Sequence, residues 1–280
     1  MITEKKLENH VNRYYQTIII ALMILFALPA MAQEEANKER QWNFTAAPYL
    51  LIPYMNGNVG IGPVEANVDA GPSEIFGNLD AGLMLFFEAS SDKWVASFDL
   101  LYMNLGGKGE TPLLSRDASV DVKQLGLTFN GLYRVVEWAS VGLGFRVNSI
   151  NQGIKMAAVP GPGPGDNDLF PAVDVSMRQT WVDPLIVARV MTRFNDSNWR
   201  LGMVADIGGF GIDMNIGGLD IGSNFTWQVN PFVGYQFSKL FEIDLAYRWL
   251  GMDYETGSDT DYFLYDMVIS GPELGLLFHF

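Results

Sequence analysis

Acidic side chains and arginines recur at alternate positions along much of the chain, and they are the residues with the most potential for chemistry. Carboxylates can act as general acids or bases, and arginines can bind anions or pair with the carboxylates. Because successive residues of a strand point to opposite faces, we expect these charges on one side of the predicted strands. The candidate network consists of Asp80, Glu88, Asp99, Arg134, Arg146, Asp183, Arg189, Arg193, Arg200, Asp206, Glu242, Asp244, Arg248 and Glu273.

Two interpretations of this network stay open. The acids and arginines are nearly balanced, and charges in a narrow interior must be paired or hydrated, which favours an ion-pair network that fills the space. The alternative is a narrow polar path for ions or small solutes. Arginine in place of lysine favours fixed pairing geometry, and therefore the first interpretation.

Catalysis has few candidate groups. Histidine is the usual general base near neutral pH, and His279 is the one histidine after the N-terminal segment. We interpret it as a polar residue of the rim. Glu242 and Asp244 share a face, but residues two apart in a strand do so by alternation alone. We expect no catalytic residues, and an enzyme that uses carboxylates is kept as a third hypothesis.

Two acidic segments have part of the pattern of a cation site. Residues 213–220 place oxygen ligands first and third, with glycines for a bend, but lack the fifth ligand and the closing glutamate of a calcium loop. The acidic residues of 253–266 are interpreted as a solvated cluster. We therefore expect no metal and no cofactor.

The first 32 residues have the pattern of a cleaved export signal. The pattern combines a positive start, an apolar stretch too short for a spanning helix of about 20 residues, and a small-residue cleavage motif. It is carried by Lys5, Lys6, Arg13, Ile18–Leu28 and Ala30-Met31-Ala32. Residues 33–280 are then expected to form one exported domain.

The chain is acidic and has no cysteine. Its formal net charge of -14 repels phosphate backbones, so we expect no nucleic-acid partner. Without cysteine, neither a disulfide framework nor a lipid-modified cysteine anchor is available. After residue 32 the sequence has no uninterrupted apolar stretch of 18 residues, which argues against helical membrane spans.

Period-two alternation of apolar and polar residues is the strongest structural signal. In 240–250, for example, Phe241, Ile243 and Leu245 share one face, while Glu242 and Asp244 share the other. In a membrane barrel one such face contacts lipid and the other faces the interior. The template predicts ten strands near 42–52, 79–89, 94–105, 119–134, 139–147, 178–194, 199–210, 224–237, 240–252 and 267–280.

The connections between these strands alternate between short and long, as in transmembrane barrels. Aromatic residues flank the short connections, where large rings favour the lipid headgroup level. The predicted long connections are 53–78, 106–118, 148–177, 211–223 and 253–266.

The last predicted strand ends with four apolar residues on one face, Leu274, Leu276, Phe278 and Phe280. This end resembles the signature by which outer-membrane barrels are recognised for assembly. We therefore expect the barrel-assembly machinery as a partner, alongside outer-membrane lipid.

Several segments resemble a widespread family of uncharacterised outer-membrane β-barrel proteins. The resemblance is specific over residues 181–280 and looser over 42–180. It departs from the family by an insertion at 213–221 and by Asn224, where the family usually has aspartate. It implies the barrel architecture and no settled activity. The segments are Trp181-Val182-Asp183-Pro184, Asp206–Gly211, Gly222–Gln228, Ala246–Leu250 with Asp253-Tyr254, and Gly271–Gly275.

Together these patterns predict an all-β, antiparallel up-and-down transmembrane barrel in the outer membrane of a Gram-negative-type bacterium. Ten strands are expected, with eight or twelve as alternatives because 42–78 is poorly patterned and 64–79 could fold into the lumen. The main functional hypothesis is a non-catalytic structural or surface-interaction barrel. A narrow channel and a carboxylate-dependent enzyme are the alternatives, and the oligomeric state is left open.

Overall fold

The computed structural model describes residues 42–111, 116–159, 168, 171–194, 197–212 and 214–280. The expected export signal at 1–32 lies outside this part of the chain and stays a prediction. Asp213, the first residue of the incomplete calcium-loop pattern, also lies outside it.

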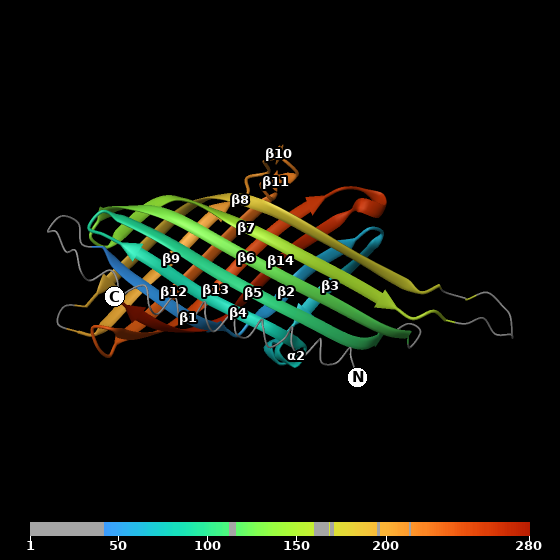
Figure 1. Cartoon of the computed structure of the whole chain (residues 1–280), viewed down its shortest axis with the longest axis horizontal. Helices are drawn as coiled ribbons and strands as arrows, with labels where there is room; N and C mark the ends of the chain where they lie inside the picture. Colours follow the sequence, from blue (N-terminus) through green and yellow to red (C-terminus); the bar gives the residue numbers. More distant parts are fainter. Residues whose placement is uncertain (1–41, 112–115, 160–167, 169–170, 195–196, 213) are drawn as a thin grey trace, which may run out of the picture. The chain divides into compact units, whose positions relative to one another are not determined.

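Ten antiparallel strands form a closed barrel, as the alternation predicted (Figure 1). Each strand pairs with its neighbour along this series, and β1 pairs with β14 to close the sheet. The ten strands are β1 (Asn43–Leu51), β4 (Leu79–Ser90), β5 (Trp94–Thr111), β6 (Arg116–Val136), β7 (Ala139–Met156), β8 (Val173–Arg193), β9 (Trp199–Gly208), β12 (Phe225–Gln236), β13 (Phe241–Thr256) and β14 (Phe263–His279). We call the end with the short turns the inner end, and the opposite end the outer end.

Burial follows the predicted alternation. On β14, Leu277 and Ile269 are buried on the inward face, whereas Leu274 and Leu276 are exposed on the outward face. The strands are rich in β-branched and aromatic residues, which fit a pleated surface that is buried on one side.

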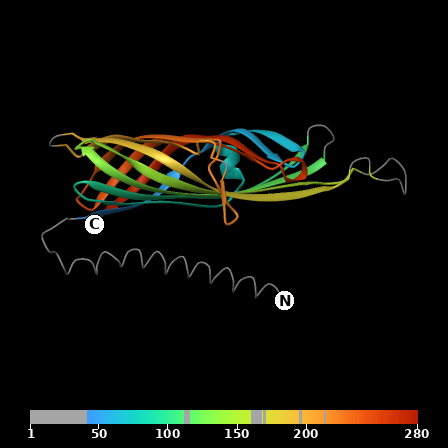
Figure 2. The same cartoon turned by 90° about the horizontal axis from the view of Figure 1, so that it is seen from above.

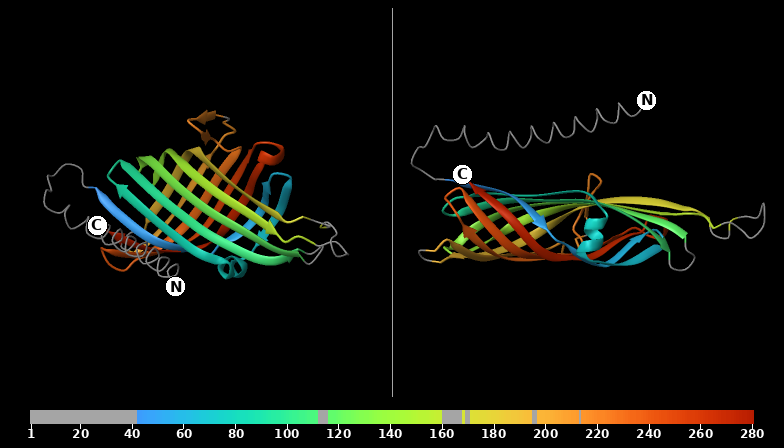
Figure 3. Two further views of the ribbon diagram at one scale, coloured as in Figure 1. Left: turned by 45° about the vertical axis from the view of Figure 1, so that its right-hand side comes forward. Right: turned by 90° about the horizontal axis from the view of Figure 1, so that it is seen from below.

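Four shorter strands and two short helices lie in segments that we expected to be long connections. The β2–β3 hairpin and helix α2 occupy 53–78, and β3 joins the sheet beside β2, which excludes a fold into the lumen for that strand. The β10–β11 hairpin lies in 211–223 and projects from the barrel (Figure 3). These elements are β2 (Tyr54–Ile61), β3 (Val64–Ala70), α2 (Pro72–Gly77), β10 (Met214–Ile216), β11 (Leu219–Ile221) and the 3-10 helix η1 (Asp259–Asp261). None of the helices in the described residues is long and apolar enough to cross a membrane.

Strands β5, β7 and β8 continue five to nine residues past their predicted outer ends, and β6 continues three residues past its own (Figure 2). They contain 18 to 21 residues each, whereas about 9–11 residues span a bilayer. On the outward faces, apolar residues give way to a row formed by Asn104, Lys123, Asn151 and Arg178, which are paired across the four strands. Beyond this row the outward face is polar, so the alternation template fails although the ladder continues.

Candidate functional site: the barrel interior

At the inner end of the interior, Glu242 holds three cationic or hydrogen-bonding partners. Its Oε1 accepts a hydrogen bond from Nε of Arg200 at 2.6 Å, and its Oε2 lies 3.1 Å from Nε2 of His279. Arg193 lies 3.6 Å from the same carboxylate. Arg200 also pairs with Asp244. Strands β8, β9, β13 and β14 thus meet in one cluster, and the Glu242 carboxylate is fully buried.

His279 also contacts a hydroxyl group. Its Nδ1 lies 3.0 Å from Oγ1 of Thr45, so a hydroxyl, an imidazole and the Glu242 carboxylate follow one another at the inner rim. Two arginines already contact that carboxylate. This arrangement fits the interpretation of His279 as a polar residue of the rim.

Arg248 joins two carboxylates in the middle of the barrel. Its Nη2 lies 2.9 Å from Asp99 on β5, and its Nε lies 2.9 Å from Glu273 on β14. The hydroxyl of Tyr49 donates a hydrogen bond of 2.8 Å to Asp99, and the guanidinium lies 5.1 Å from the centre of the tyrosine ring. The contacts connect β1, β5, β13 and β14 across the interior.

A second buried pair lies nearby. Nη2 of Arg146 lies 2.9 Å from both carboxylate oxygens of Asp206, and both side chains are almost completely inaccessible. The other guanidinium nitrogens donate to the hydroxyls of Thr128 and Thr226. Every nitrogen of this guanidinium therefore has a partner, as buried charges require.

Asp183 differs from the other buried carboxylates because its hydrogen-bond donors are neutral. Oδ2 accepts from Nδ2 of Asn148 and Nε1 of Trp181, both at 2.9 Å. Oδ1 accepts from the backbone N–H of Ser223 at 2.6 Å. The carboxylate thus anchors the connection that carries the β10–β11 hairpin, whose Asp220 pairs in parallel with Trp181 on β8.

Most of the predicted charge network is brought together in this interior. Glu88 pairs with Arg189 at 2.7 Å, which adds a further contact between β4 and β8. Arg134 lies at the inner rim and donates to the backbone carbonyl of Asp92. Asp80 does not join the network. The register shifts between Leu79 and Ala81, so alternation breaks there and the Asp80 side chain is exposed.

The outer half of the interior is mainly apolar, with Gln124 and Gln152 as buried polar exceptions, and the sequence reasoning missed this. Aromatic residues, methionines and leucines from most of the strands pack together there. Trp181 stacks on Tyr254 with ring centres 4.0 Å apart and nearly parallel planes. The available signal was the alternate series Phe263, Tyr265, Met267 and Ile269, which is wholly apolar and lies buried on the inward face of β14. The buried members are Tyr49, Leu51, Met55, Ile75, Leu101, Met103, Ile150, Trp181, Leu250, Met252, Tyr254, Phe263, Tyr265, Met267 and Ile269.

The outside of the barrel carries a broad apolar belt. Leucines, phenylalanines and valines of the outward faces are exposed, and Leu143 reaches 70% exposure. Tryptophans at the inner end, such as Trp94 and Trp138, are exposed beside the short turns. A closed sheet satisfies its backbone hydrogen bonds internally, and an apolar exterior with aromatic girdles suits lipid rather than water. This fold and this surface define an outer-membrane β-barrel.

The four residues of the expected assembly signal lie on β14 or directly after it. Leu274, Leu276 and Phe280 are exposed, and Phe278 packs against Phe241 with ring centres 5.6 Å apart. Their recognition by an assembly machinery stays a prediction.

The comparisons with known proteins do not identify the chain beyond this class. No family model and no curated protein matches the chain. Among solved structures, it is similar to Ail, the attachment invasion locus protein of Yersinia pestis, with 11% identity and a TM-score of 0.38 over 85% of this chain and 98% of that chain. It is also similar to the translocator domain of autotransporter NalP from Neisseria meningitidis, with 12% identity and a TM-score of 0.40 over 96% of this chain and 98% of that chain. A FadL homologue of Pseudomonas aeruginosa is similar with 12% identity and a TM-score of 0.32 over 86% of this chain and 89% of that chain. Such low values carry no information about the activity or ligand of this chain.

Proposed function

We propose that this protein is a non-catalytic outer-membrane barrel with a closed interior, and that its role lies in the surface it presents outside the cell. The observation that carries the proposal is the filling of the interior. Paired charges such as Arg146–Asp206 occupy the inner and middle parts, and the Trp181–Tyr254 stack lies in the apolar outer part. Ten strands enclose only slightly more space than eight, which side chains just fill.

The surface role is supported by the long strands β5 to β8. Beyond the row from Asn104 to Arg178, their outward positions include Ser176, Asp174 and Lys155, which are exposed, and the last two form an exposed ion pair. Hairpins that extend past the lipid as continuous ladders offer a rigid polar surface to partners outside the membrane. A barrel without such a role would need strands no longer than the bilayer requires.

The proposal includes export by a cleaved signal at 1–32 and insertion by the barrel-assembly machinery. The apolar outward end of β14 supports the second step, because it exposes Leu274 and Leu276 in the C-terminal strand of the barrel.

Conductance recordings of refolded protein in planar bilayers test the closed interior. We expect no discrete current steps, because paired charges and the aromatic stack occupy the interior at successive levels. Folding and insertion are checked on the same sample by the shift in electrophoretic mobility between unheated and heated protein. Steps in folded wild-type protein that change when Arg189 or Arg248 is replaced by alanine would contradict the proposal and favour the narrow channel.

A further inference from the structure

The barrel wall is not hydrogen-bonded along its whole height between β1 and β4. Their ladder runs from Asn43–Ser90 to Pro48–Leu85 and ends there. On the far side of each strand the pairing continues, since β4 remains paired with β5 to Leu79, and β1 remains paired with β14 to Leu51. The wall is therefore parted between these two strands, from Pro48 and Leu85 towards the outer end.

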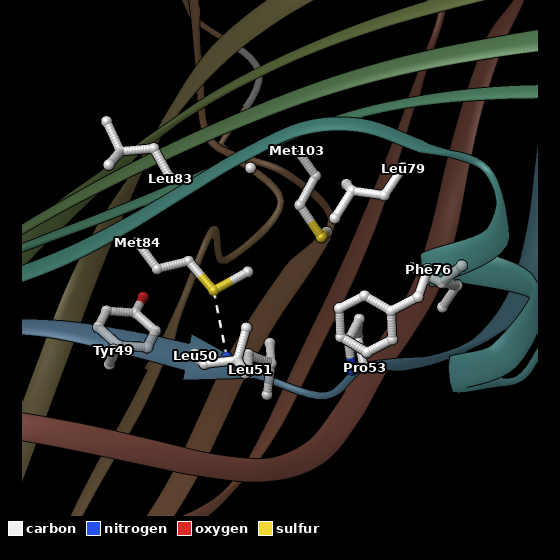
Figure 4. Close-up of a pocket in the computed structure, with 11 residues that line it drawn as sticks. Tyr49, Leu50, Leu51, Pro53, Phe76, Leu79, Leu83, Met84 and Met103 are labelled. Atoms are coloured by element: carbon white, nitrogen blue, oxygen red, sulfur yellow. Dashed lines mark hydrogen bonds between the residues drawn. The ribbon is translucent and has the colours of Figure 1, made fainter. Parts of the chain in front are cut away.

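On the β1 side of this parting, the backbone donors do not need a neighbouring strand. The N–H of Leu51 points towards β4 and donates to the sulfur of Met84 at 3.3 Å (Figure 4). The next position along the chain whose backbone N–H would point towards β4 is occupied by Pro53, which has no N–H. The chain therefore leaves no donor unpaired at these two positions, which matters because an unpaired backbone donor is costly in lipid.

A cavity of about 130 Å³ lies in the parting (Figure 4). It is lined by outward residues, Leu50 and Leu83, and by their inward neighbours Leu51 and Met84, together with the buried Met103. Because consecutive strand residues point to opposite faces, a cavity with both kinds of lining crosses the wall. It connects the lipid-facing surface with the apolar core of the outer half.

The lining indicates what can occupy the cavity. It contains no charged side chain, and its one hydroxyl, that of Tyr49, already donates to Asp99. Methionine side chains adapt their shape to an apolar guest. Helix α2 contributes Ile75 and Phe76 at the edge of the cavity. The ligand must therefore be a hydrocarbon.

The level of the opening decides where that hydrocarbon comes from. Leu50 pairs with Leu274, which pairs with Leu245, and all three are exposed residues of the lipid belt. Beyond Leu50, the first polar outward residue on this side is Asn56 on β2, three outward positions further along. On the β4 side, Leu83 pairs with Tyr102, one outward position below Asn104, so the cavity opens at the outer margin of the acyl-chain region.

We propose that this opening is a binding site for the hydrocarbon chain of a membrane lipid, which enters the barrel wall from the side between β1 and β4. Dry apolar cavities of about 150 Å³ accept a benzene-sized guest, so the site takes the last six or so carbons of one chain. The proposal depends on the membrane position of the barrel and is independent of whether the lumen conducts ions.

Photochemical labelling from within the bilayer tests the site. The mature protein is refolded in phosphatidylcholine vesicles that contain a phosphatidylcholine with a diazirine near the end of one acyl chain. After irradiation, mass spectrometry locates the adducts. We expect adducts on the inward residues Met84 and Met103 as well as on Leu50 and Leu83. Adducts confined to outward residues of the belt would overturn the proposal, whatever the variants below do.

A variant whose new side chain fills the cavity provides a second test of the proposal. Gly82 lines the cavity, and a Cβ added there would meet its nearest atoms at 3.7 Å, which is ordinary contact. Gly82→Leu should lower labelling of Met103 about tenfold, as a loss of 1.4 kcal/mol in binding would. Labelling of Leu274 should not change. Gly131→Leu is the matched control, because a Cβ at Gly131 meets only the carbonyl of Leu143, at 4.0 Å. Unchanged labelling of Met103 in folded Gly82→Leu would show that the chain does not enter here.

Discussion

Arg146 on β7 and Asp206 on β9 form a buried ion pair that reaches across β8. The same guanidinium donates to Thr128 on β6 and Thr226 on β12, so one side chain ties together strands from opposite parts of the sheet. Removing one member of such a pair strongly destabilises the structure, because the other charge is left buried without a partner. Removing both members costs far less, because no unpaired charge remains in the interior.

Replacement of one partner should therefore destabilise the barrel more than replacement of both. We expect Asp206→Asn to lower the free energy of unfolding by about 3–5 kcal/mol. The double variant Arg146→Met, Asp206→Leu should recover most of this loss. Urea unfolding in lipid vesicles measures both. Lys155→Ala, which breaks an exposed pair, is the control and should change little. A double variant as unstable as Asp206→Asn would contradict this account.

A charge on the lipid-facing belt gives a test of the membrane position. Leu143 is 70% exposed, so an arginine there would be tolerated if water covered this face. In lipid, Leu143→Arg should cost about 2–4 kcal/mol of unfolding free energy, as charged substitutions near the bilayer midplane do. Ser176→Arg, on the polar extension of β8, should leave the unfolding transition unchanged. Equal stability of the two variants in vesicles would place Leu143 outside the lipid.

The absence of cysteine allows the orientation to be tested directly. A membrane-impermeant maleimide should label Ser176→Cys on intact cells, because this residue lies on the outer extension. Glu137→Cys, in a short turn at the inner end, should react only after the outer membrane is permeabilised. The reverse pattern of labelling would mean that the long hairpins point into the periplasm.

Asp183 should control the connection that carries the β10–β11 hairpin. Asp183→Ala removes the acceptor of the Ser223 N–H, so residues 209–223 should become sensitive to proteinase K on intact cells. Asn148→Ala removes one donor from the same carboxylate and keeps the Ser223 contact, and it should protect the segment as the wild type does. If both variants are cleaved at the same rate, the hydrogen bond to Ser223 is not what holds the segment.

The C-terminal residue should matter for assembly in cells and not for the final fold. We expect Phe280→Gln to accumulate as protease-sensitive, unfolded protein in cells, yet to refold in detergent with the yield of the wild type. Phe237→Gln, at another exposed aromatic position of the inner end, is the control and should assemble normally. Heat-dependent electrophoretic mobility measures the folded fraction in each case. Equal assembly of both variants would remove Phe280 from the recognition signal.

The transmembrane part of the fold could be predicted from sequence because lipid imposes the same chemistry on every second residue. The ten strands and their inward charges follow from that rule. The rule predicts which face of the sheet a residue occupies, but not which residue lies across the interior from it. The pairing of Arg248 with Asp99, which are distant in sequence, therefore required the structure. The rule also stops where lipid stops, which is why β5 to β8 were predicted too short. At Asp80 a bulge reverses the faces, and alternation has no means to foresee it.

The β2–β3 hairpin adds a strand to one rim of the barrel only. The β1–β2 segment runs along β14 through Pro53, and β3 attaches to the edge of β2 away from β14, the side on which β1 meets β4 lower down. Beyond Pro48 and Leu85 the sheet therefore ends at the outer edge of β3 and does not close on β4, so on this side the outer rim is open whereas the inner rim is closed. Lengthening or trimming this hairpin would change how far that edge extends while leaving the ion pairs below untouched.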